Sequence, residues 1–250
     1  MGATESPRRN ALVFDIETIA DLTPATRDAV AALAKGRDMT AEDYGGLCPP
    51  LARVVCIAWF EVASRTLGAF VDATLHCGEI PPFVDVQDGS GATQSALHCA
   101  LRPCAGEADL LRAFGQHVLR HVTRPNAQLV TYNGRGFDLP VLVHRAIKHG
   151  VSDGRDVLAK AARENRYNPL MHLDLMDAVT FNGAAPRFPL AAYAIGYGFP
   201  SPKRDMDGSQ VGPAVHAGRI LDVARYCAGD VLATTHVYRC LYEPSIALTP

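Results

Sequence analysis

An apolar run near the start of the chain, LVFDIETI from Leu12 to Ile19, contains two carboxylates two positions apart. Its β-branched and aromatic residues predict a buried strand, yet burying an ionised carboxylate without a partner is costly. Residues i and i+2 of a strand point to the same face, about 6.6 Å apart along the backbone. Asp15 and Glu17 can therefore hold the same cation, and hard divalent ions such as Mg²⁺ prefer oxygen ligands. The run predicts a central strand that carries half of a cation site.

Strand and helix patterns alternate along the rest of the chain. Further strands are expected at Arg53–Val62, in the TLGAFVDATL segment that pairs with it, in AQLVTYN and in HLDLMDAV. Helical spacing occupies residues 107–122, DLPVLVHRAIKHG and 218–243, and an alanine-rich helical stretch follows the first strand. The alternation indicates an α/β fold with a mixed sheet. Residues 77–105, which include Pro81, Pro82, Gly89, Gly91 and Pro103, are expected to form an irregular insertion.

Composition narrows the class of protein. The 250 residues are 48% hydrophobic and 20% charged, which suits one globular domain. No apolar run approaches the roughly 20 residues of a membrane span, and seven scattered cysteines without a C-x-x-C pair indicate reduced thiols, so a cytoplasmic location without membrane contact is expected. A net charge of −2 argues against a protein that coats nucleic acid, but not against an enzyme that grips one strand end.

Two later segments bring further acidic residues. LVTYNGRGFDLP, residues 129–140, is a strand and a glycine-rich turn that places Asp138 at the start of the next helix. RYCAGD, residues 225–230, sets Tyr226 and Asp230 four apart on one helix face. Taken singly, Asp138 is equally typical of a helix N-cap, and the Tyr226–Asp230 pair of a solvated helix surface.

Together and in chain order, these segments resemble a family. D-x-E on the first strand, N-x-x-x-F-D after a middle strand and Y-x-x-x-D on the last helix are similar to the three motifs of the DEDD 3'-5' exonucleases, in the subgroup that uses tyrosine. The closest resemblance is to the predicted 3'-5' exonucleases related to the proofreading domain of family-B DNA polymerases. It extends from about Leu12 to Tyr238, includes the stretches TYNGRGFDLPVL, HLDLMD and KRDMDGSQV, and leaves out the tail and residues 77–105.

The resemblance implies a ribonuclease H-like fold, with a central mixed five-stranded sheet flanked by helices, and a site with two Mg²⁺ or Mn²⁺ ions. Asp15 would bridge both ions, Glu17 and Asp230 would complete the tighter site, and Asp138 would hold the second ion. Tyr226 would orient the attacking water. Arg225 stands where the sister subgroup has a histidine, which favours the tyrosine form.

Substrate contacts are expected from six residues: Asn133, Arg135, Phe137, Lys203, Arg204 and Ser209. Arg135 is the favoured phosphate ligand of the second motif, whereas burial is favoured over base stacking for Phe137. The loop Asp205–Gln210 lacks the glycine and glutamate positions of a calcium loop, so a turn near the catalytic face is expected there. Asp174 and Asp177 are expected to be solvated acids at a strand end rather than further ligands.

The expected protein is thus a disordered tail at 1–10 and a 3'-5' exonuclease domain at 11–243, acting on 3' ends of single-stranded DNA, with RNA as the alternative substrate. DNA replication or repair proteins are the expected partners. Two other functions stay open: a catalytically idle nucleic-acid-binding module, and a phosphodiesterase acting on small nucleotides. All five catalytic residues are present, which argues against an idle binder.

Overall fold

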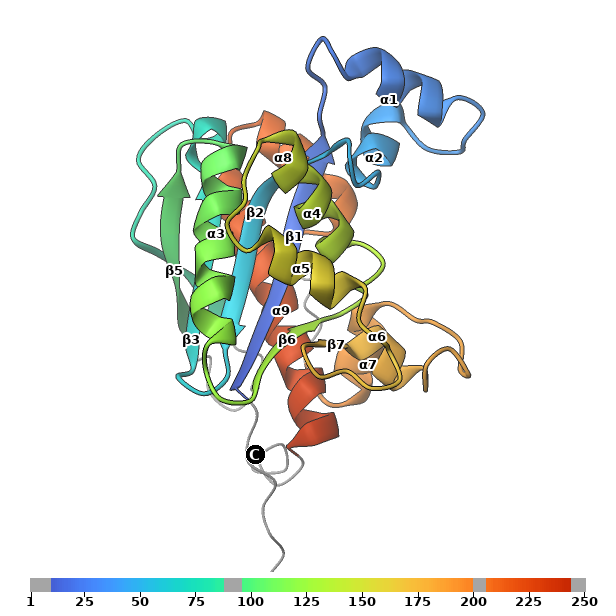
Figure 1. Cartoon of the computed structure of the whole chain (residues 1–250). Helices are drawn as coiled ribbons and strands as arrows, with labels where there is room; N and C mark the ends of the chain where they lie inside the picture. Colours follow the sequence, from blue (N-terminus) through green and yellow to red (C-terminus); the bar gives the residue numbers. More distant parts are fainter. Residues whose placement is uncertain (1–9, 88–95, 200–205, 244–250) are drawn as a thin grey trace, which may run out of the picture.

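Strand β1 (Asn10–Ala20) lies inside a seven-stranded sheet that has helices on both faces (Figure 1). This computed structural model describes residues 10–87, 96–199 and 206–243. The order of the strands is β4-β5-β3-β2-β1-β6-β7. Their bounds are β2 (Ala52–Glu61), β3 (Thr66–Asp72), β4 (Phe83–Gln87), β5 (Ala96–Cys104), β6 (Ala127–Thr131) and β7 (His172–Asp174).

The sheet is mixed, as the sequence predicts. Strands β1, β2 and β3 form an antiparallel meander, whereas β6 runs parallel to β1 and β7 parallel to β6. These five strands are the ones expected from the sequence, and they form the centre of a ribonuclease H-like fold. Because β1 and β6 are parallel, their carboxyl ends meet at the same edge of the sheet. The residues that follow β6 therefore lie near the acidic part of β1.

The segment 77–105 differs from the expectation, because it is not an irregular insertion. It contains β4 and β5, so the sheet has seven strands instead of five. Strand β5 runs parallel to β3 and antiparallel to β4, and it extends the sheet beyond the β3 edge. The FVDVQ run of β4 alternates buried and exposed residues, as an edge strand does. The run has only five residues, and the glycines and prolines around it indicate an irregular segment, so the sequence pattern does not reveal the strand.

The helices follow the expected pattern with several short additions. Helix α9 occupies Ile220–Tyr242 and α3 occupies Glu107–Val122, close to the predicted bounds. Across the described ranges, no helix has both the length and the apolar character that a membrane crossing requires. The other helices are α1 (Arg27–Ala34), α2 (Ala41–Gly46), α4 (Asp138–Lys148), α5 (Arg155–Ala162), α6 (Leu175–Val179), α7 (Leu190–Gly196) and α8 (Val211–His216), with 3-10 turns η1 (Ala73–Leu75) and η2 (Gly208–Gln210).

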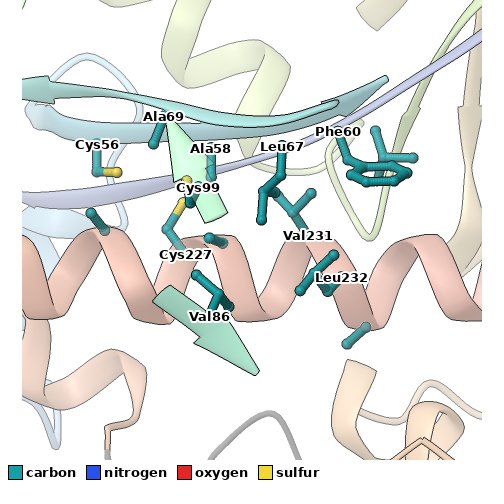
Figure 2. Close-up of a cluster of buried hydrophobic side chains, with 14 of the residues drawn as sticks. Cys56, Ala58, Phe60, Leu67, Ala69, Val86, Cys99, Cys227, Val231 and Leu232 are labelled. Carbon is teal, nitrogen blue, oxygen red and sulfur yellow. The ribbon is translucent and has the colours of Figure 1, made fainter. Parts of the chain in front are cut away.

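Two apolar cores lie on opposite faces of the sheet, and β1 contributes to both. Its even-numbered residues Leu12, Phe14 and Ile16 pack with α3 and α4, while Ala11, Val13 and Ile19 pack with α9. Figure 2 shows the second of these layers, between the sheet and α9. Since successive side chains of a strand alternate between faces, the odd-numbered Asp15 and Glu17 belong to the α9 face.

Candidate active site

The first two carboxylates of the site come from the middle of β1. Asp15 is paired with Ala58 of β2 and Glu17 with Cys56, and the register shifts directly after Glu17 at a β-bulge. Glu17 is only 8% exposed. Bulges increase local twist and redirect side chains, and they are frequent beside active sites. Strand β1 thus presents both carboxylates toward α9, as the spacing in the sequence predicts.

Helix α9 supplies the residues that face this strand. Small buried side chains at Ala224 and Ala228 let the helix approach the sheet closely. The thiol of Cys227 donates to the backbone oxygen of Asp15 at 3.4 Å, which fixes the height of the helix on β1. Tyr226 and Asp230 lie on either side of that contact along the helix, four residues apart. The Y-x-x-x-D motif therefore faces the acidic part of β1 and not solvent.

The turn between β6 and α4 delivers the remaining carboxylate. Asn133 adopts a left-handed backbone with φ of 65°, and a side chain at Gly134 would meet Thr131 Oγ1 at 2.3 Å, so a glycine is required there. Asp138 begins α4 and is 3% exposed. Its Oδ1 is buried and has no hydrogen-bond partner within the described residues. The N-cap of α4 is Phe137, so Asp138 is the first residue of the helix and does not cap it.

The pKa shifts of the site residues indicate that the four carboxylates lie close together. Burial raises the pKa of Asp15 well above its usual range, and the charges of Asp138, Glu17 and Asp230 raise it further. Burial, followed by the charge of Asp174, raises the pKa of Asp138 to about 7, although hydrogen bonds that include one with Asp15 oppose the shift. Two carboxyl groups that share a hydrogen bond must hold a proton between them. The pKa shifts of Asp15 and Asp138 have the direction expected for acids brought together in one buried site.

Tyr226 stays protonated in this environment. Burial raises the pKa of its phenol above the ordinary value, and the neighbouring charges of Asp230, Glu17 and Asp15 add to the shift, as does a hydrogen bond to Asp230. A phenol that stays neutral cannot accept a proton as a phenolate would, but it keeps its O–H group for donation. Its position among three carboxylates suits a group that orients a small polar molecule, and excludes a tyrosinate base at neutral pH.

The donor set fits a hard divalent cation. Asp15, Glu17, Asp138 and Asp230 offer carboxylate oxygens, which Mg²⁺ and Mn²⁺ prefer, and the orphaned Asp138 Oδ1 lacks the partner that a buried oxygen requires. One donor atom each from Asp15, Glu17 and Cys227 also lie within 4.8 Å of one another. The structure thus brings all five predicted catalytic residues to one place.

The predicted substrate residues are less uniform. Arg135 has internal partners, because its Nε donates to Asp177 at 3.1 Å and its Nη1 to the backbone oxygen of Glu164 at 2.6 Å. Phe137 is half-buried and packs against the core on the α4 face, as favoured for it, and Asn133 lies at the turn beside the site. Ser209 sits in the exposed turn η2, where its Oγ donates to Asp207 at 2.5 Å. Lys203 and Arg204 lie outside the described residues.

The two acids expected to be solvated are buried, which corrects that expectation. Asp174 is 4% exposed, and its carboxylate accepts the backbone amides of Asn133 at 2.8 Å and of Arg135 at 2.9 Å. Asp177 pairs with the guanidinium groups of Arg135 and Arg166. The two acids hold the turn that carries Asp138, and Arg135 works with them. A contact between Arg135 and substrate phosphate stays a prediction, and it would require the guanidinium to exchange partners.

These features define an α/β nuclease-type domain with a carboxylate site at the centre of its sheet. The family model described as "Predicted 3'-5' exonuclease related to the exonuclease domain of PolB" matches residues 93–244. The chain belongs to this family, which confirms the predicted resemblance and the nuclease class of enzyme. The comparison with curated proteins found no match.

The range matched by the family model contains some of the predicted site residues and not others. It includes Asn133, Asp138, Tyr226 and Asp230, and it begins after Asp15 and Glu17. It also begins before β5, within residues 77–105, a segment that the predicted resemblance did not include. The structure therefore joins the two motifs of the matched range to the D-x-E strand, which precedes that range by more than 70 residues.

Proposed function

We propose that the chain is a 3'-5' exonuclease of the tyrosine-using DEDD type, which removes nucleotides from the 3' end of single-stranded DNA by a two-metal-ion mechanism. RNA is the alternative substrate. The observation that carries the proposal is the convergence of four carboxylates from β1, α4 and α9, in which Asp138, Glu17 and Asp230 all raise the pKa of Asp15. Such mutual repulsion is expected where a site is built to hold cations.

Asp15, Glu17, Asp138 and Asp230 would hold two Mg²⁺ or Mn²⁺ ions. When bound, these ions supply a nucleophile at neutral pH and relieve the charge that develops on the leaving 3' oxygen. Asp15 would serve both ions, and its interaction with the other three carboxylates supports this role. Tyr226 would orient the attacking water through its hydroxyl group, held in place by Asp230.

A cavity lies beside the carboxylate site, and none of the five predicted catalytic residues is among its lining residues. Its volume is about 480 Å³, within the range of small-molecule sites, and it opens where β1 ends, beyond Glu17. Ile19, Arg53, His76 and His216 are among its lining residues. Arg53 is paired with the buried Asp72 at 2.6 Å and keeps 31% of its side chain exposed.

Two other functions would use parts of the same site. A phosphodiesterase for small nucleotides would need the same cations, and its rate would not depend on strand length. A binding module without activity would not need the full set of carboxylates, and the structure brings all of them together.

A cytoplasmic location and association with replication or repair proteins belong to the same proposal. The seven free cysteines suit a reducing compartment.

The test is time-resolved cleavage of 5'-labelled single-stranded DNA and RNA of matched sequence, with Mg²⁺, Mn²⁺ or EDTA. We expect a metal-dependent ladder that shortens from the 3' end. Asp15→Asn should lower the rate by at least about 100-fold, because it removes a direct metal ligand. Asp222→Asn is the matched control, since Asp222 lies on α9 but pairs with the exposed Arg225. Strand binding without cleavage under every metal would overturn the proposal.

A further inference from the structure

Cys227 lies directly beneath the carboxylates of the site. Its side chain is fully buried, and its Sγ is 3.4 Å from the backbone oxygen of Asp15 and 3.9 Å from Asp15 Oδ2. Figure 2 shows it on α9, in the same layer as the buried Cys56 and Cys99. A thiol contributes little to a site for hard cations, because Mg²⁺ and Mn²⁺ bind through oxygen. The proposed exonuclease mechanism therefore gives this sulfur no chemical role beyond its hydrogen bond to the backbone of Asp15.

We propose that Cys227 makes this a binding site for a thiophilic divalent cation, such as Zn²⁺ or Cd²⁺, held by Cys227 Sγ together with Asp15 and Glu17. Donor atoms of these three residues lie within 4.8 Å of one another, close enough to surround one ion. Asp138, which interacts with Asp15 and whose buried Oδ1 has no hydrogen-bond partner among the described residues, lies outside this group of three, so its carboxylate would have to shift to become a fourth donor.

The spacing suits tetrahedral coordination by sulfur and oxygen. Zinc binds thiolate at about 2.3 Å and carboxylate at about 2.1 Å, which places the two donor atoms about 3.6 Å apart. The distance of 3.9 Å between Cys227 Sγ and Asp15 Oδ2 needs only a small adjustment. On binding, the thiol proton passes to solvent and the sulfur forms a bond to the ion, with no change in oxidation state.

Such an ion would compete with Mg²⁺ for Asp15 and Glu17. Mg²⁺ would use the carboxylates alone, whereas Zn²⁺ or Cd²⁺ would gain the thiolate in addition, so the thiophilic ion binds more tightly. It would also occupy Asp15 in a tetrahedral set of donors that leaves no room for the two-ion arrangement. We therefore expect the sensitivity of the nuclease to Zn²⁺ to depend on Cys227; this part rests on the proposed function, but the binding itself does not.

The binding is tested by titrating the full chain with Cd²⁺ and measuring the ultraviolet charge-transfer absorption of cadmium–thiolate bonds. We expect one contribution to be lost in both Cys227→Ala and Asp15→Asn, and kept in Cys99→Ala, which removes a buried thiol of the same core. Cys227→Ser provides a second variant of nearly unchanged shape, and it should also lose the contribution. Retention of the full absorption in the Cys227 variants would overturn the proposal. Retention in Asp15→Asn would also overturn it, because the ion would then be bound by thiols alone.

Inhibition gives the second readout. At fixed Mg²⁺, Zn²⁺ should inhibit the wild-type chain at a concentration at least about tenfold lower than it inhibits Cys227→Ser, since the loss of a direct ligand exceeds the usual cost of a lost outer contact. Equal inhibition of both would contradict the competition. Should the chain cleave neither DNA nor RNA, the cadmium titration would still decide the metal site, so the two proposals can fail separately.

Discussion

Tyr226 illustrates how one hydroxyl group can be assigned a role from its surroundings. Its phenol stays neutral because burial and three carboxylates raise its pKa, and it is hydrogen-bonded to Asp230. A neutral phenol cannot act as a base, so its contribution must come from orientation. In the proposed mechanism it positions the water and does not activate it.

Tyr226→Phe is therefore expected to lower kcat by about 10- to 100-fold, the cost of misplacing a reacting group, while the affinity for Mn²⁺ changes little. Single-turnover cleavage and calorimetric titration with Mn²⁺ measure the two effects. A variant with full activity would remove the tyrosine from the mechanism, and a variant that loses Mn²⁺ affinity would make Tyr226 a structural support of Asp230. Tyr167→Phe, on an exposed side chain, is the control.

At the scale of elements, the pairing of β6 and β7 positions the turn that carries Asp138. His172 of β7 is fully buried, and its Nε2 lies 2.8 Å from Thr131 Oγ1 at the end of β6. Thr131 also accepts from the amide of Gly134 at 3.2 Å, so the histidine, the threonine and the turn form one chain of contacts. Burial, and then the charge of Arg135, lowers the pKa of His172 to about 3.

This shift predicts how stability depends on pH. The unfolded histidine takes up a proton below about pH 6.5, whereas the folded one stays neutral down to about pH 3. The unfolded state therefore binds more protons in this window, and the free energy of unfolding falls as the pH drops from 6.5 towards 3, by up to about 1.4 kcal/mol per pH unit. Urea unfolding across this range should show a shallower dependence in His172→Gln than in the wild type. Equal slopes in the wild type and in His172→Gln would contradict the assignment.

The elements also show where sequence reasoning succeeds. The alternation of β1 predicts that Asp15 and Glu17 share a face, and the apolar spacing predicts α3 and α9 nearly to the residue, because both are local patterns. The sequence does not predict strand β4, because this edge strand has only five residues and three of them are exposed. Nor does it predict the burial of Asp174, since its partners are backbone amides 39 and 41 residues away that no local pattern reveals.

At the scale of the whole molecule, a buried ionic cluster connects the elements around the site. The Arg145 side chain of α4 is 1% exposed, and its guanidinium contacts Glu107 at the start of α3 at 2.7 Å and Asp21, after β1, at 2.9 Å. Lys148 and His149 join the same two acids. Burial alone would raise the pKa of Asp21, but hydrogen bonds from Lys148 and Arg145 lower it to about 2.

Arg145→Met should destabilise the protein by about 3–5 kcal/mol, because it leaves two buried carboxylates with fewer compensating charges. Chemical denaturation at pH 7 measures this loss. Arg155→Met, whose ion pair with Asp156 is exposed, should change stability by less than about 1 kcal/mol. If the two substitutions cost the same, the cluster does not connect β1, α3 and α4 in the way described.

In contrast to the ionic cluster, the carboxylate site destabilises the metal-free folded state, because its acids repel one another until a cation binds. Without metal, Asp15 lies among three other acids that raise its pKa, so the folded state carries an electrostatic cost that the unfolded chain lacks. Asp15→Asn removes part of this repulsion. We expect the metal-free variant to melt at a higher temperature than the metal-free wild type, as happens when a functional site is relieved of strain that its function requires.

Mg²⁺ or Mn²⁺ should reverse that order. An ion that binds only the folded state stabilises it by about 2.7 kcal/mol at 100 times its dissociation constant, so the melting temperature of the wild type should rise with metal concentration, while that of Asp15→Asn should barely change. Calorimetric scans with and without EDTA measure both effects, and Asp222→Asn should respond like the wild type. A wild-type melting temperature indifferent to both ions would show that the four carboxylates are balanced from within the fold, and the exonuclease proposal would lose its cofactor.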